Sequence, residues 1–115
     1  MITRNLYRYQ AEVIRVIDGD TFDAMVDLGM STFTKVRVRI LGIDAPEKTG
    51  PTKDAGIASM FFLNSLIETK ELKRITIKTV KKDSFGRWLA QVWTPDGEDI
   101  APIILAANQA VPSRE

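Results

Sequence analysis

Apolar and basic residues alternate without interruption from position 35 to position 40, and this run constrains the fold more than any other part of the chain. Successive side chains of a β-strand point to opposite faces, so a period of two places all of the apolar residues on one face. The apolar positions are Val36, Val38 and Ile40, and the basic positions are Lys35, Arg37 and Arg39. The run predicts a half-buried strand with one cationic face, which ends at the proline-containing segment 42–46.

Weaker alternation predicts four more strands, separated by turns that contain glycine, proline or aspartate. They cover residues 9–17, 22–28, 75–79 and 88–92. In the first of them, the alternation places Arg15 on the same face as Ala11 and Val13, with Ile14 and Val16 on the other face.

Two helices complete the predicted elements. The first covers about 55–68, where residues recur at helical spacing, and the second begins at an N-cap, Asp99, and ends near Asn108. The recurring positions of the first helix are Ala55, Ala58, Phe61, Phe62, Ser65 and Leu66. We also expect four aromatic residues to pack in or near the core, namely Phe61, Phe62, Trp88 and Trp93.

The order of these elements is three strands, a helix, two strands and a short C-terminal helix. A mainly β protein with this order matches the OB-fold, a five-stranded and partly open Greek-key barrel with a helix between the third and fourth strands. At 115 residues, the chain 1–115 is long enough for one such domain and too short for two.

The composition removes much of the chemistry that enzymes use. The chain has no histidine and no cysteine, which excludes serine–histidine triads, cysteine nucleophiles and Cys/His zinc sites within it. Carboxylate, amine, guanidinium and hydroxyl groups remain, together with metals that prefer oxygen ligands. Without a signal-peptide pattern or a run of membrane-spanning length, we expect a cytoplasmic protein with no membrane partner.

Charge is distributed unevenly, although the net charge is only +1. Residues 35–87 contain twelve Lys/Arg and six Asp/Glu, whereas the flanking segments are acidic. A basic segment of this kind suits a polyanionic partner, but for a charge run alone a solvated lysine-rich surface is the more common explanation.

Three short motifs and one arginine carry the functional prediction. They are Asp18–Thr21, Asp44–Glu47, Phe85–Arg87 and Arg39. Taken alone, each has an ordinary explanation: Asp-Gly-Asp is a common turn, and Arg87 is within reach of Asp83 for a simple ion pair. Together, however, they place carboxylates and guanidinium groups at strand ends and turns. Hard oxygen ligands for a divalent cation beside arginines that can grip phosphate indicate a phosphodiesterase site.

The chain resembles the staphylococcal nuclease homologues in residues 16–21, 36–47 and 83–90, and the resemblance runs from about residue 9 to residue 111. The family's OB-fold agrees with the fold predicted from periodicity. By this resemblance, Asp20 and Asp44 would ligate Ca²⁺ together with the backbone carbonyl of Ala45. Glu47 would act as the general base or position the attacking water. The resemblance assigns the phosphate to Arg39 and Arg87.

The same resemblance implies a calcium-dependent nuclease of low sequence specificity that cleaves DNA or RNA, preferably single-stranded, and leaves 3′-phosphate ends. Phe85, Lys48, Lys81 and Lys82 are expected to contact the substrate, although Phe85 replaces a tyrosine of the best-known members. A homo-oligomer that covers exposed barrel surface is a further expectation.

The alternative is a catalytically silent OB-fold module that binds nucleic acid or serves as a scaffold. Silent copies of this domain have usually lost an arginine or an acidic ligand. All five of these residues are present here, which favours the enzyme; they are Asp20, Arg39, Asp44, Glu47 and Arg87.

Overall fold

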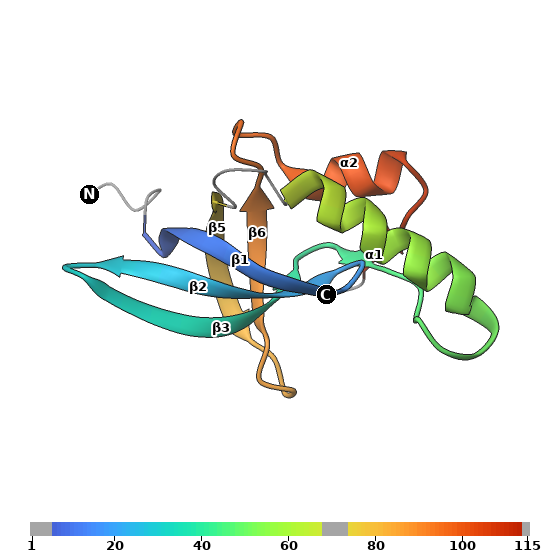
Figure 1. The fold of residues 1–115 in the computed structure, drawn as a ribbon, viewed down its shortest axis with the longest axis horizontal. Coiled ribbons are helices and arrows are strands. Elements are labelled where there is room, and N and C mark those ends of the chain that lie inside the picture. Colours follow the sequence, from blue (N-terminus) through green and yellow to red (C-terminus); the bar gives the residue numbers. More distant parts are fainter. Residues whose placement is uncertain (1–5, 68–73, 114–115) are drawn as a thin grey trace.

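The computed structural model describes residues 6–67 and 74–113, in which five strands close into a barrel (Figure 1). The strands are β1 (Arg8–Asp18), β2 (Thr21–Gly29), β3 (Thr32–Ile40), β5 (Arg74–Lys82) and β6 (Trp88–Trp93). Their order around the barrel is β1-β2-β3-β6-β5, and β1 also pairs with β5 to close it. Only β3 and β6 run parallel among these pairs. The predicted OB-type barrel is confirmed.

Two α-helices, one 3₁₀ turn and a second, small sheet complete the described structure. They are α1 (Lys53–Ile67) and α2 (Ile100–Ala106), the 3₁₀ turn η1 (Gly50–Thr52), and the pair β4 (Ile43–Asp44) and β7 (Val111–Pro112). Asp99 caps α2 as predicted, because its carboxylate accepts from the N–H of Ala101 at 3.3 Å. Asn108, near which the second helix was predicted to end, has a left-handed conformation with φ 57°. The β4–β7 pair was not predicted, and Glu68, the predicted end of the first helix, lies outside the described residues.

The core lies inside the barrel and beneath the helices. Its strand residues are those that point inward, and they are Ala11, Val13, Phe22, Ala24, Val26, Val38, Ile40, Ile75, Ile77, Ala90 and Val92. Leu63 and Ile67 of α1 and Ile100 and Ile104 of α2 belong to the same cluster. Each aliphatic side chain of this size contributes roughly 1.5–3 kcal/mol when fully buried. No helix within the described ranges is long and apolar enough to span a membrane.

The predicted buried face of α1 was wrong. Four of its positions are exposed, namely Ala55, Ala58, Phe61 and Ser65. The expectation that Phe61 packs in or near the core was therefore wrong. The buried positions are instead Gly56, Ser59, Leu63 and Ile67. Small residues line the N-terminal half of this face, because α1 approaches the neighbouring loops too closely for larger side chains. Phe62 packs against the core as predicted, and Trp88 and Trp93 are half-buried.

A register shift in β1 corrects a second expectation. Val13 pairs with Ala24, but the next paired residue is Arg15 opposite Asp23, so Ile14 is left as a bulge. The bulge moves Arg15 from the inner face, where strict alternation would place it beside Val13, to the outer face. Ile14 is consequently exposed.

Candidate active site

Asp20 lies in the tight turn between β1 and β2, where Thr21, Ala45 and Arg39 hold its carboxylate. Thr21 donates its hydroxyl to Asp20 Oδ1 at 2.9 Å, and the backbone N–H of Ala45 donates to Oδ2 at 2.9 Å. The residue is only 7% exposed. The turn packs closely on α1, because a Cβ on Gly19 would lie 1.9 Å from the Ser59 hydroxyl oxygen. Packing, rather than a special backbone angle, therefore requires glycine at this position.

Arg39 is the centre of the site and not an exposed strand arginine. Its side chain is 8% exposed, and its Nη2 donates to Asp20 Oδ2 at 3.4 Å, to the Ile43 carbonyl at 3.3 Å and to the Asp44 carboxylate. The N–H of Ile40 also donates to the Asp20 carbonyl at 2.8 Å, which ties the end of β3 to the turn. Asp20 and Asp44 thus meet around the guanidinium group of Arg39. We call these three residues the carboxylate centre.

Asp44 is the last residue of β4, and the loop that follows carries Ala45 and Glu47. The β4–β7 ladder aligns Asp44 opposite Val111, which fixes the backbone from which the Asp44 side chain reaches Arg39. The Glu47 carbonyl accepts from the Thr52 hydroxyl at 2.8 Å, and a Cβ on Gly56 would lie 2.3 Å from that carbonyl oxygen. The backbone of Glu47 is therefore held against α1, while the residue is exposed and its carboxylate makes no hydrogen bond or ion pair to any described residue.

Arg87 lies at the end of the β5–β6 hairpin and pairs with Asp83. Its Nε donates to Asp83 Oδ2 at 2.8 Å, while the N–H groups of Phe85 and Arg87 donate to Oδ1 at 2.9 Å each. Burial alone would raise the pKa of Asp83, but these hydrogen bonds outweigh it and lower the pKa. Asp83 therefore remains ionised near neutral pH and holds the guanidinium of Arg87.

The four residues expected to contact substrate occupy different surroundings. Phe85 is 81% exposed at the hairpin, with the Arg87 guanidinium 5.2 Å from its ring centre. Lys48 lies beside the β1–β2 turn, because its Nζ is 3.7 Å from Asp18 Oδ1. Lys81 and Lys82 are exposed on β5, and Lys82 lies over the ring of Trp88. Within the described residues, no hydrogen bond or ion pair links either of these two lysines to the carboxylate centre.

The oxygen atoms around Arg39 form a donor set that also suits a metal cation. The two carboxylates of Asp20 and Asp44 and the Ile43 carbonyl converge on one positively charged nitrogen, Arg39 Nη2. Carboxylate and carbonyl oxygens are the ligands that Ca²⁺ prefers. Across residues 6–67 and 74–113, no group of three or more acidic, histidine or cysteine residues is arranged to hold a metal. A cation here would therefore depend on two carboxylates, with Arg39 displaced from between them.

Sequence reasoning identified the charged groups and missed the residues that hold them. Thr21, Ser59 and Gly56 fix the turn, the helix and the loop, but hydroxyl and glycine residues give no distinctive sequence signal. Asp83 was named only as an ordinary partner of Arg87, and that pairing is confirmed. Whether the Ala45 carbonyl binds a cation stays a prediction.

Comparison with known proteins identifies the family of this chain. Residues 37–112 match the family model described as "Staphylococcal nuclease homologue". A protein named "Uncharacterized endonuclease" from Escherichia coli O157:H7 is 36% identical over 98 residues, which are 85% of this chain and 57% of the relative. The "Thermonuclease" of Staphylococcus intermedius is 37% identical over 87 residues, 73% of this chain and 48% of the relative.

A third relative, the "Micrococcal nuclease" of Shigella flexneri, is 32% identical over 90 residues, 76% of this chain and 44% of the relative. The chain thus spans about half the length of these relatives. The family model covers the carboxylate centre from Arg39 onward and the whole Arg87 hairpin. On these grounds, the chain belongs to the family of staphylococcal nuclease homologues.

Proposed function

We propose that this domain hydrolyses phosphodiester bonds of DNA or RNA with bound Ca²⁺, prefers single strands and leaves 3′-phosphate ends. The observation that carries the proposal is the buried position of Arg39 between Asp20 and Asp44. Burying a guanidinium at a strand end is costly unless its charge is used or fully paired. The names of the relatives, which include an endonuclease and a thermonuclease, support the same class of reaction.

Asp20 and Asp44 would hold the cation, because their oxygens already converge on a positively charged atom. The chemistry that Ca²⁺ supplies when bound is polarisation of a phosphate oxygen and orientation of water. Arg39 would turn from the carboxylates toward the phosphate. Asp20 is the better anchored ligand, since Thr21 and Ala45 fix it from two sides.

The remaining residues divide the work of hydrolysis. Glu47, whose carboxylate is exposed, would accept a proton from the attacking water. The oxygen of that water bonds to phosphorus, the bond from phosphorus to the 5′ oxygen breaks, the 5′ oxygen takes up a proton from solvent, and Glu47 returns its proton to solvent. Charge on the phosphoryl oxygens rises in the transition state, so the planar forks of Arg39 and Arg87 stabilise it more than the ground state.

One observation favours the alternative, a silent binding or scaffold module. Both arginines are paired with carboxylates of this chain, Arg39 with Asp20 and Asp44, and Arg87 with Asp83. Ion pairs of this kind also occur where arginine has only a structural role.

Digestion of single-stranded DNA separates the two functions. We expect cleavage with Ca²⁺, no cleavage with excess chelator, and a loss of at least about 100-fold in Arg87→Ala. Lys35→Ala, which removes an exposed cation from the outer face of β3, is the control and should cleave normally. Cleavage by Arg87→Ala at the control's rate would contradict the proposal, and a folded protein that binds DNA without cutting it would favour the binding module.

A further inference from the structure

Two arginines outside the predicted site, Arg15 on β1 and Arg37 on β3, share one buried carboxylate. Asp23 on β2 is 3% exposed and accepts from Arg37 Nε at 2.8 Å, from Arg37 Nη2 at 3.2 Å and from Arg15 Nε at 3.2 Å. The sheet register produces this contact, because Arg15 and Arg37 are the cross-strand neighbours of Asp23 on its two sides. We call these three residues the arginine row.

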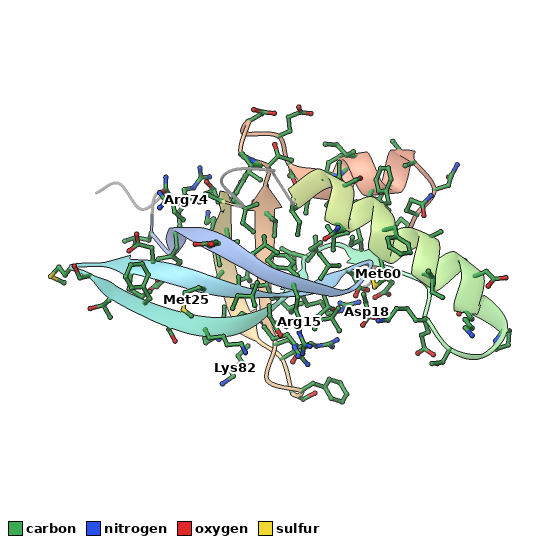
Figure 2. All side chains as sticks on the ribbon, in the orientation of Figure 1. Arg15, Asp18, Met25, Met60, Arg74 and Lys82 are labelled. Atoms are coloured by element: carbon green, nitrogen blue, oxygen red, sulfur yellow. The ribbon has the colours of Figure 1, made fainter. Side chains whose placement is uncertain are left out.

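The bulge at Ile14 creates the row. Without the extra residue, Arg15 would point into the barrel beside Val13, and Asp23 would face one arginine only. Arg15 and Asp18 lie at the same end of β1, toward α1 (Figure 2). Asp18 is the other acidic group near Arg37, and Lys48 offsets its charge at 3.7 Å.

The row lies beside both arginines of the candidate active site. Arg39 follows Arg37 by two residues on the same face of β3, which separates them by about 7 Å along the strand. Arg87 immediately precedes Trp88, whose partner in the parallel ladder is Val38, the residue after Arg37. If this register is continued by one residue, Arg87, which lies just before β6, falls beside Arg37 of β3. A strand of nucleic acid held at Arg39 and Arg87 would pass the row next.

Among the residues that the structure describes, both guanidinium groups of the row use only part of their donors, and both side chains reach solvent. The Arg15 side chain is 65% exposed and that of Arg37 is 44% exposed, whereas the Asp23 side chain beneath them is 5% exposed. A guanidinium has five N–H donors, and each arginine gives only part of them to Asp23. The hydrogen bond from Arg37 lowers the pKa of Asp23, so its carboxylate stays ionised and holds both forks in place. Two cations on one carboxylate leave a positive charge at the surface.

We propose that Arg15 and Arg37 bind a second phosphate, the neighbour of the scissile one, on a nucleic acid strand that crosses the outer face of the barrel. Asp23 is a positioning residue that orients the two forks. This proposal rests on the proposed function for the position of the scissile phosphate at Arg39 and Arg87. The arginine row would then be the site that makes a longer strand bind more tightly than a dinucleotide.

Binding without cleavage tests the row directly. The probes are oligodeoxythymidylates of two and eight nucleotides, labelled with fluorescein through an uncharged linker and measured by anisotropy in excess EDTA. Arg37→Ala should weaken binding of the octanucleotide about tenfold and binding of the dinucleotide less than twofold. Arg15→Ala should act in the same direction but less, since Arg15 is the more exposed. The matched control is Lys35→Ala, which removes the same charge from the same strand and face and should change neither probe by more than about twofold.

Asp23→Asn distinguishes binding by two oriented guanidinium groups from non-specific attraction by positive charge. The substitution makes the face more cationic, so non-specific attraction alone predicts tighter binding of the octanucleotide. Our proposal predicts weaker binding, because the forks lose the carboxylate that orients them. Arg37→Lys keeps the charge and should weaken the octanucleotide about as much as Arg37→Ala, since lysine lacks the planar fork. Thermal unfolding of each variant shows that the domain is intact, and Arg37→Lys serves where Arg37→Ala does not fold.

The outcomes are distinct from those of the proposed function. Arg37→Ala behaving like Lys35→Ala, or weakening both probes equally, would overturn the second phosphate site, and tighter binding by Asp23→Asn would overturn the positioning role. Hydrolysis plays no part in these measurements. The second phosphate site can therefore be absent from a protein whose cleavage depends on Ca²⁺ and Arg87, and it can be present in one that never cleaves.

Discussion

Arg39 and Arg87 are paired with carboxylates in two very different ways. Arg39 is buried, and its partners come from the β1–β2 turn and the β4 loop, 19 and 5 residues away. Arg87 is more exposed, and its partner Asp83 lies four residues away in the same hairpin. The contacts of Arg39 require β2 and β3 to pair, because Thr21, next to Asp20, lies opposite Arg39, whereas the Arg87 pair is built by one local turn. A site can thus combine a group fixed by the pairing of several segments with a group fixed by its own loop.

Replacing each arginine by alanine tests this comparison and has the largest expected effect. Both variants should lose at least about 100-fold in the rate of single-stranded DNA cleavage. Only Arg39→Ala should also lose stability, by about 3 kcal/mol, because it leaves the buried Asp20 carboxylate without its cation. Arg87→Ala should cost under about 1 kcal/mol, as for partly exposed pairs. Urea unfolding of both variants gives the difference, and equal losses would contradict the distinction.

Glycine substitutions probe the packing of the same two regions. A Cβ on Gly56 would meet the Glu47 carbonyl at 2.3 Å, so Gly56→Ala must push α1 away from the loop. We expect a loss of about 1–3 kcal/mol in stability together with slower cleavage, since Glu47 moves.

The hairpin offers the matched case, Gly86→Ala. Gly86 has φ 82° and open space around its Cα, so alanine there brings backbone strain of about 1–2 kcal/mol and no collision. Cleavage rates at saturating substrate should fall for Gly56→Ala much more than for Gly86→Ala. The reverse order would show that the hairpin, and not the α1 contact, limits the chemistry.

The charged residues of the site could be predicted from sequence, but their supports could not. Asp20, Arg39, Asp44 and Arg87 stand in motifs whose residue types already indicate phosphate and cation chemistry. The buried face of α1 was predicted wrongly because its closest contacts are made by Gly56 and Ser59, which carry no hydrophobic periodicity.

The arginine row was missed for a related reason. Period-two reading of β1 assumes an unbroken ladder, but the bulged residue Ile14 moves Arg15 and Val16 to the opposite faces, before a second register shift between Val16 and Asp18. Asp23 lies on the outer face of β2, where alternation predicts an exposed polar residue, and yet it is nearly fully buried. Bulges depend on pairing with another strand, so local alternation cannot reveal them.

The pH dependence of stability provides a third way to test the Asp83–Arg87 hairpin. The folded state lowers the pKa of Asp83 below its ordinary value of 3.8, so its contribution to stability is present above that value and is lost as pH falls through the folded pKa. Asp83→Asn should therefore flatten the decline of stability at pH below about 4. Unfolding by urea at pH 7 and at pH 3 gives the change in each protein. An unchanged pH dependence would mean that the hairpin pair does not form in solution.

Phe85 gives the smallest expected effect and the clearest test of the hairpin as a substrate contact. Its ring is exposed and lies 5.2 Å from the Arg87 guanidinium, a contact that contributes about 0.5–1 kcal/mol at an exposed site. Phe85→Ala should leave stability nearly unchanged and raise the KM for single-stranded DNA several-fold, with little change in kcat. Phe85→Leu, which keeps apolar bulk without a ring, is the matched control. If leucine restored the KM, apolar contact would suffice. If only an aromatic residue did so, the hairpin would stack on a base or orient Arg87 through the ring, and the locally built half of the site would contribute to binding as well as to catalysis.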